Sequence, residues 1–184
     1  MSIGDINSPE KGSGARFNDG KPDLALLPLR LLGNAYLRAD DVRWRRDNLA
    51  LPGVPETASP YVMVLEGPAV ALQHLGAFQH WPSSSPLYDA LTALDDNTGW
   101  ADCARVFEYG RKKYAAWNWA KGMPWSVPLA CAARHLVALL DHEDKDPESG
   151  LPHRGHVYCN VVMLLQYLKT YQEGNDLPPK GLLL

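Results

Sequence analysis

The chain has 184 residues, of which 46% are hydrophobic, and its formal net charge is −3. This length suits one sizeable domain, and the hydrophobic content is too high for a disordered chain. The small negative charge argues against charge-driven binding to DNA or to a membrane surface, and it still allows a local basic patch that binds a nucleotide.

Two further features of composition concern the compartment. No apolar run approaches the roughly 20 residues of a membrane span, and the N-terminal residues lack the apolar core of a signal peptide. Cys103, Cys131 and Cys159 lie on separate apolar segments without CxxC spacing, which is typical of buried thiols in a reducing compartment. We therefore expect a cytoplasmic protein.

The N-terminal part begins with residues 1–15, whose Gly, Ser, Pro and charged residues predict a flexible arm. Asn18-Asp19-Gly20 predicts a turn, and Asp23 can cap a helix that follows. Pro28 lies one turn into that helix, so the helix is expected to start late or to bend.

The composition of residues 38–85 differs from that of the rest of the chain, because this segment contains many prolines and a run of serines. It predicts a loosely packed insertion of unknown role. Within this segment, Tyr61–Leu65 is similar to a strand and Ala69–Phe78 to a helix. The cluster Arg43-Trp44-Arg45-Arg46 predicts a solvated turn, with an anion contact as the alternative.

Helical patterns then continue to the C-terminus. We expect helices at Pro86–Leu94, at Trp100–Tyr114 with Asp95–Thr98 as capping residues, after Ser126 as cap, and at about His153–Glu173. Residues 175–184 predict an extended arm. The fold class is therefore all-α: a bundle-like domain of four or five helices formed by residues 16–37 and 86–174, with the irregular insertion between them.

Four of the six histidines lie between Arg134 and Asn160, together with five carboxylates. At 100° per residue, His135 and His142 share one helix face, and His153, His156 and Asn160 form a stripe on the next helix. Two helices joined by a short turn are antiparallel neighbours, so the two stripes can face each other. Imidazole and carboxylate are ligands of divalent cations, and one or two such ions can bind here. The structural alternative is that these residues only cap helix ends.

A second group combines basic and aromatic residues. Glu108 precedes Lys112, Lys113 and Tyr114, and the loop that follows contains Trp117, Asn118 and Trp119. Lysine and arginine next to metal-bound carboxylates suit a triphosphate, aromatic faces can stack on a base, and Asn118 can bind a base edge. The alternative is a solvated basic face with tryptophans in the core.

Three separated blocks carry a resemblance to a known family. They are Gly14–Pro22, Ala104–Gly122 with its Tyr109-Gly110 and Lys112-Lys113-Tyr114, and Arg134–Asn160 with its Asp146-Pro147-Glu148-Ser149-Gly150. In this order the blocks resemble the N-terminal domain of phage dATP/dGTP diphosphohydrolases. The resemblance covers about residues 14–35 and 100–168, and residues 36–99 carry none of it.

The resemblance implies an all-α nucleotide pyrophosphohydrolase related to the MazG-like group. Such an enzyme cleaves a purine deoxynucleoside triphosphate to the monophosphate and pyrophosphate with Mg²⁺ or Mn²⁺. It also implies a dimer or tetramer, and we expect no direct nucleic-acid binding. The MazG-like pattern has clustered glutamates on one helix and Glu-x-x-Asp on the next. This chain keeps Glu143-x-x-Asp146 and has only Glu108 of the first element, so His135, His153 or His156 can replace the missing carboxylates.

The predicted mechanism is in-line attack of water at the α-phosphorus. The expected metal ligands are Glu143, Asp146, His135, His153 and His156, and Glu108, Glu143, Asp146 and Glu148 are the expected catalytic carboxylates, with Glu148, Glu108 or a histidine as base. The expected substrate-binding residues are Arg16, Lys21, Lys112, Lys113, Tyr114, Trp117, Asn118, Trp119, Arg134 and Asn160. Two alternatives stay open: a catalytically inactive nucleotide-binding module, and a phage structural or interaction protein with a structural metal site.

Overall fold

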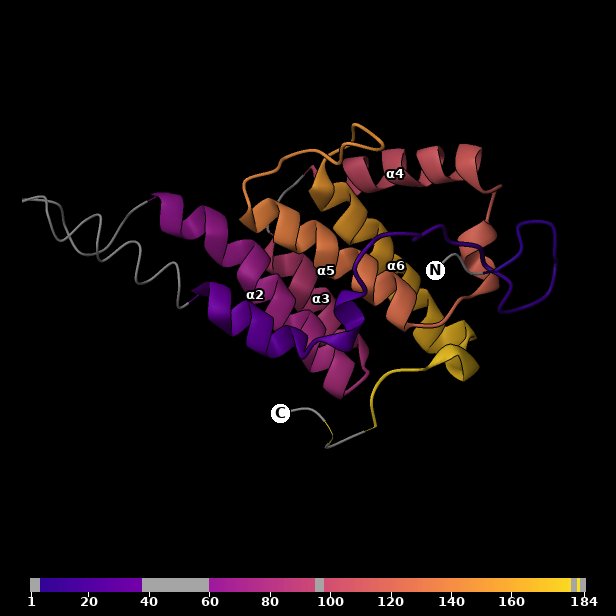
Figure 1. Ribbon diagram of the computed structural model, residues 1–184, viewed down its shortest axis with the longest axis horizontal. Coiled ribbons are helices and arrows are strands. Elements are labelled where there is room, and N and C mark those ends of the chain that lie inside the picture. Colours follow the sequence, from indigo (N-terminus) through magenta and orange to yellow (C-terminus); the bar gives the residue numbers. More distant parts are fainter. Residues whose placement is uncertain (1–3, 38–59, 95–97, 180–181, 183–184) are drawn as a thin grey trace, which may run out of the picture.

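The fold consists of helices joined by loops (Figure 1). A computed structural model describes residues 4–37, 60–94, 98–179 and 182 of the chain. The helices are α2 (Pro60–His80), α3 (Ser84–Ala93), α4 (Gly99–Lys113), α5 (Ser126–Leu140) and α6 (His153–Thr170), with short 3-10 helices η1 (Leu24–Leu26), η2 (Asn118–Lys121) and η3 (Gln172–Gly174). Residues 29–37 are also helical. The described ranges contain no strand, so the expected all-α class is confirmed; Lys145 and Pro152 form an isolated bridge.

Helix α6 lies at the centre of the packing and contacts α3, α4 and α5, while α2 packs against α3 and α5 (Figure 1). The core between them is built from fully buried large side chains, among them Phe78, Trp125, Leu136, Leu164 and Tyr167. Burying each such side chain stabilises the fold by about 1.5–3 kcal/mol. All three cysteines are free and buried, as expected. None of the helices in the described ranges has both the length and the apolar character that a bilayer crossing needs.

Helix α2 corrects the prediction for residues 38–85. Residues 61–65 are helical and do not form a strand, whereas the helix expected at 69–78 is confirmed as part of α2. Its C-terminal half is well packed, with Leu72, Leu75 and Phe78 fully buried, so the expected loose packing is wrong there. The cluster at residues 43–46 lies outside the described residues.

Local signals at the other helix ends were partly right. The chain does break at Pro28, between η1 and the helix at 29–37, and buried Gln79 binds the backbone on both sides of the break. Thr98 makes no side-chain capping bond to α4. Ser126 is the first residue of α5 and not its cap, and the carboxylate of Asp176 accepts bonds from its N–H and its hydroxyl.

The N-terminal segment at residues 12–22, here called the N-terminal strap, is held against the domain. Gly12 and Gly14 donate backbone hydrogen bonds to the carbonyl oxygens of Lys121 and Gly122, at 2.6 and 2.8 Å. The Asn118 side chain completes the attachment, since it accepts from the Ala15 N–H at 3.1 Å and donates to the Ala15 carbonyl at 3.0 Å. Residues 12–15 therefore do not form the expected flexible arm. The strap crosses in front of α5 and α6 (Figure 1).

Candidate active site

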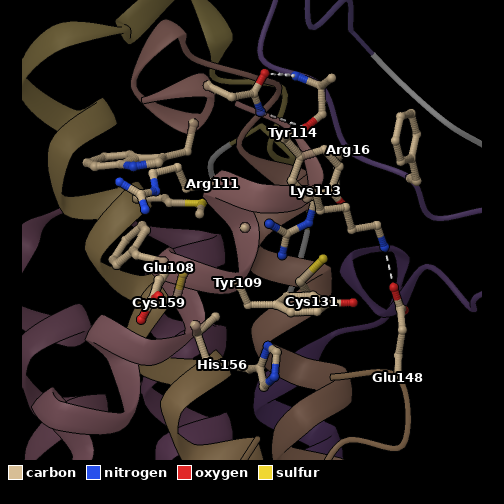
Figure 2. Close-up of a pocket in the computed structure, with 18 of the residues that line it drawn as sticks. Arg16, Glu108, Tyr109, Arg111, Lys113, Tyr114, Cys131, Glu148, His156 and Cys159 are labelled. Atoms are coloured by element: carbon tan, nitrogen blue, oxygen red, sulfur yellow. Dashed lines mark hydrogen bonds and ion pairs between the residues drawn. The ribbon is translucent and has the colours of Figure 1, made fainter. Parts of the chain in front are cut away.

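A pocket of about 910 Å³ lies between the strap, α4, the loop after α4, α5, the loop at 141–152 and α6. Figure 2 shows side chains from these elements converging on it. Most residues predicted from the sequence line the pocket: Arg16, Lys21, Glu108, Lys113, Tyr114, Trp117, Asn118, Trp119, Arg134, His135, Asp146, Glu148, His153 and His156.

Two arginines form a cationic region inside the pocket. Arg16 donates from Nη2 to Oδ1 of Asn160 at 2.8 Å, and Asn160 is itself fixed by a bond from its Nδ2 to the His156 carbonyl. Arg134 donates to the carbonyl of Pro22 at 2.7 Å and to Oδ1 of Asn18 at 3.2 Å. In the described ranges, both guanidinium groups therefore bond to neutral groups, and their charges lack a carboxylate partner.

The pKa of Cys131 reflects the positive charge of these two arginines. Its sulfur lies 2.9 Å from Arg134 Nη2, and Figure 2 shows it beside Arg16. Burial alone would raise the pKa of the Cys131 thiol, but the guanidinium groups of Arg16 and Arg134 lower it below its usual value. A site that favours a thiolate also favours a bound anion.

Glu148 bridges two lysines at the pocket. One carboxylate oxygen lies 2.7 Å from Lys21 Nζ, and the other bonds to Lys113 Nζ (Figure 2). The bonds from Lys113 and Lys21 lower the pKa of Glu148 to about 2. The bridge ties the strap, the end of α4 and the loop at 141–152 together through one carboxylate.

Three histidines form a cluster at the junction of α5 and α6. His135 Nδ1 lies 2.8 Å from His153 Nδ1, and the His135 ring stacks on His156 with centroids 4.4 Å apart. Burial lowers the pKa of all three imidazoles, that of His156 to about 4, so they are neutral at neutral pH. Neutral imidazole is the form that binds a metal.

Asp146 joins this cluster through a fixed carboxylate. Its Oδ2 accepts from both the N–H and the hydroxyl of Ser149, at 2.8 Å each. Since the single hydroxyl proton of Ser149 is donated there, the 2.8 Å contact between Ser149 Oγ and His156 Nε2 requires the proton on Nε2. Ser149 thus orients both the carboxylate and the neighbouring imidazole.

The donor atoms of His135, Asp146 and His153 fit a metal ion. One ligand atom from each can be chosen so that all three lie within 4.8 Å of one another. In addition, Nε2 of the buried His153 has no hydrogen-bond partner among the described residues. An unsatisfied buried nitrogen is costly, which favours a further group at this cluster.

Other residues predicted as metal ligands lie outside this set. Glu143 is 62% exposed and 3.8 Å from His153 Nε2. His156 Nε2 lies 3.8 Å from the Asp146 carboxylate but is bonded to Ser149. The prediction that His142 shares a helix face with His135 is wrong, because α5 ends at Leu140 and His142 is exposed with a φ of 63°.

The other wall of the pocket is aromatic. Phe17 and Tyr114 are in contact at 5.2 Å between ring centroids, and Trp119 lies 5.1 Å from Phe107 and 6.2 Å from Trp117. Trp117 is 73% exposed and has a left-handed backbone with a φ of 59°, which costs a bulky residue about 1–3 kcal/mol. Strain of this kind is concentrated at ligand sites.

Three predicted substrate residues have other roles or positions. Asn118 commits both polar ends of its amide to Ala15, so it holds the strap and is not available to read a base. Lys112 does not line the pocket and pairs with Glu108 at 3.2 Å. Asn160 does not line the pocket either and acts through Arg16.

The sequence-based site omitted some pocket residues: Phe17, Asn18, Tyr109 and Cys131. The first three belong to the motif blocks at 14–22 and 104–122, and this could have indicated that they lie in the site. Cys131 carried no signal, because the sequence did not show that two arginines lie beside its sulfur.

Together, these features define a helical protein with a pocket that combines cationic groups, an aromatic wall and a histidine–carboxylate cluster. Residues 88–177 match the family model described as dATP/dGTP diphosphohydrolase, N-terminal, and this part of the chain is similar to that family. The match begins ahead of residue 100, so the expected absence of resemblance throughout 36–99 is wrong for residues 88–99. None of the curated proteins and none of the solved structures matches the chain.

Proposed function

We propose that the chain is a metal-dependent pyrophosphohydrolase that cleaves dATP or dGTP to the deoxynucleoside monophosphate and pyrophosphate. The family match supports a dATP/dGTP substrate. The observation that carries the proposal is the pocket itself, in which two guanidinium charges lie with a histidine–carboxylate cluster and have no carboxylate partner among the described residues. A guanidinium charge inside a protein pocket is unfavourable until an anion pairs with it.

The phosphates would bind to Arg16, Arg134, Lys21 and Lys113. One arginine can donate two parallel hydrogen bonds to phosphate oxygens, and each lysine adds a point charge along the triphosphate. Two of these four residues, Arg16 and Lys21, belong to the strap. The bonds between Asn118 and the strap would therefore help to position both of them.

The purine would stack on the aromatic wall. Trp117 offers an exposed indole at the pocket, and Phe17 and Tyr114 offer a second aromatic surface. Stacking on aromatic side chains contributes about 1–3 kcal/mol per base and is tolerant of base identity, which fits a family described by two purines.

His135, Asp146 and His153 would hold the cation, Mg²⁺ or Mn²⁺. When bound, the cation neutralises phosphate charge and makes a water molecule more acidic. Glu148 would receive the proton of the attacking water. In the free protein its two lysines make it a poor base, and it regains basicity when phosphates take both lysines.

Turnover of each deoxynucleoside triphosphate tests this function. We expect monophosphate and pyrophosphate from dATP or dGTP with Mg²⁺ or Mn²⁺, and none with EDTA. Asp146→Asn should lower kcat by roughly 100-fold or more, because metal-supplied charge stabilisation is worth several kcal/mol. The exposed acid Asp141 supplies the control Asp141→Asn, which should retain activity.

Other outcomes identify the alternatives. Nucleotide binding without any monophosphate release would indicate an inactive binding module. Release of inorganic phosphate in place of pyrophosphate would reject attack at the α-phosphorus. We further propose a cytoplasmic dimer or tetramer, which analytical ultracentrifugation can test.

A further inference from the structure

The donor set of the histidine–carboxylate cluster determines which cations suit it. The cluster draws one residue from α5, one from the loop at 141–152 and one from the start of α6: His135, Asp146 and His153. Two of the three donors are therefore nitrogens. In the described ranges, Glu143 is the nearest candidate for a further carboxylate at His153, and it is mostly exposed.

The spacing of the two histidines already suits a shared ligand. His135 Nδ1 and His153 Nδ1 are 2.8 Å apart. Two nitrogens bound to one cation at about 2.1 Å and at right angles are about 3 Å apart. A small outward adjustment would let both face one ion.

Proton counting shows that the cluster is incomplete without a ligand. If His153 Nδ1 donates to His135, its Nε2 is a buried bare lone pair. If His153 Nδ1 accepts, its Nε2 carries a buried proton with no partner among the described residues. Either tautomer leaves one buried polar atom unsatisfied. When both Nδ1 atoms bind the cation, His153 Nε2 carries the proton, and the Glu143 carboxylate, 3.8 Å away in the free protein, is in position to accept it.

Asp146 is prepared to complete the set. Ser149 holds its Oδ2 with two bonds, and its Oδ1 accepts no hydrogen bond within the described ranges. A ligand held by a partner of this kind keeps its orientation, and loss of the partner typically costs 10–100-fold in metal affinity.

We infer that this site is a two-histidine, one-carboxylate centre that selects a first-row transition cation of the Mn²⁺, Fe²⁺, Co²⁺ or Zn²⁺ kind over Mg²⁺. Imidazole suits these borderline ions, whereas Mg²⁺ prefers oxygen ligands and keeps several waters. The inference rests on the proposed function for the presence of a cation and narrows its identity.

Metal binding to the full-length protein, with no nucleotide present, tests this inference. After EDTA treatment and dialysis, calorimetric titration should show Mn²⁺ and Co²⁺ binding at least roughly tenfold more tightly than Mg²⁺. His135→Gln and His153→Gln should each lose roughly tenfold or more of the Co²⁺ affinity. The matched control is His142→Asn, at an exposed left-handed position that asparagine tolerates, and it should bind like the unmodified protein.

A spectroscopic readout avoids dependence on variants that fail to fold. Electron spin-echo spectra of the Mn²⁺-loaded protein should show modulation from directly bound imidazole ¹⁴N. Absence of that modulation, or Mg²⁺ binding as tightly as Mn²⁺, would overturn the inference. Nitrogen-ligated Mn²⁺ with no nucleotide turnover would instead support the inference and reject the proposed function, whereas turnover without nitrogen ligation would do the reverse.

Discussion

At the scale of single residues, the proposed function makes Glu148 a competitor of the substrate phosphates. Its carboxylate pairs with both Lys21 and Lys113 in the free protein. A triphosphate bound to these lysines would have to displace the carboxylate, so the bridge would oppose binding before Glu148 could assist chemistry.

Glu148→Gln should therefore separate binding from catalysis. We expect it to bind inorganic tripolyphosphate roughly 2–10-fold more tightly, since partly exposed ion pairs contribute about 1 kcal/mol or less. The same variant should lower kcat by roughly 10²-fold or more if Glu148 is the base. Calorimetry without metal and steady-state kinetics measure the two effects.

Glu173→Gln is the matched control, because Glu173 pairs with exposed Lys11 away from the pocket. It should change neither quantity. Weaker tripolyphosphate binding by Glu148→Gln would show that Glu148 organises the lysines for the ligand and does not compete with it.

At the scale of elements, the strap is held by bonds that the sequence does not reveal. Asn118→Ala should leave the N–H and carbonyl of Ala15 without their buried partner, at a cost of about 1–3 kcal/mol. We expect faster amide exchange over residues 12–17 and a raised KM, because the strap places Arg16 and Lys21.

Hydrogen exchange by mass spectrometry checks this expectation. Asn34→Ala serves as control, since the Asn34 side chain accepts a hydrogen bond from Gln73 of α2, away from the strap. Unchanged exchange in residues 12–17 of Asn118→Ala would mean that the backbone bonds of Gly12 and Gly14 suffice.

The elements also show where sequence reasoning works. Helices α4, α5 and α6 were predicted closely. Helix α4 buries one regular face, whereas the consecutive buried residues 128–133 of α5 and 155–161 of α6 show that these two helices are enclosed on more than one side. Helix α2 was missed in its first half, where Tyr61, Val62 and Val64 are typical of a strand and Pro68 interrupts the helical pattern. Tertiary packing overrides such local preferences.

The site was predictable to the extent that it is local. His135, Asp146 and His153 lie on neighbouring elements, so helix spacing could bring them together. By contrast, the partners of Asn118 and Ser126 are Ala15 and Asp176, far away in the sequence. Long-range hydrogen bonds have no periodic signature and therefore could not be predicted.

At the scale of the whole molecule, the pocket and the core share their supports. Helices α5 and α6 carry fully buried leucines (Leu129, Leu136 and Leu164) as well as the histidine cluster. Protonation of groups in the site should therefore change the free energy of unfolding. The buried neutral histidines are the groups for which this effect should be largest.

Acid should destabilise the metal-free protein below pH 6.5. Burial lowers the pKa of His135, His153 and His156 in the folded state, whereas unfolding exposes ordinary imidazoles near 6.5. The unfolded state thus binds more protons, and the free energy of unfolding falls as pH decreases, by at most about 1.4 kcal/mol per pH unit for each histidine. For His156 this loss should continue down to about pH 4, its pKa in the folded state. Urea denaturation in EDTA between pH 7.5 and 5 measures the slope, which His156→Gln should reduce. A slope that His156→Gln leaves unchanged would mean that this imidazole is already protonated in the folded protein.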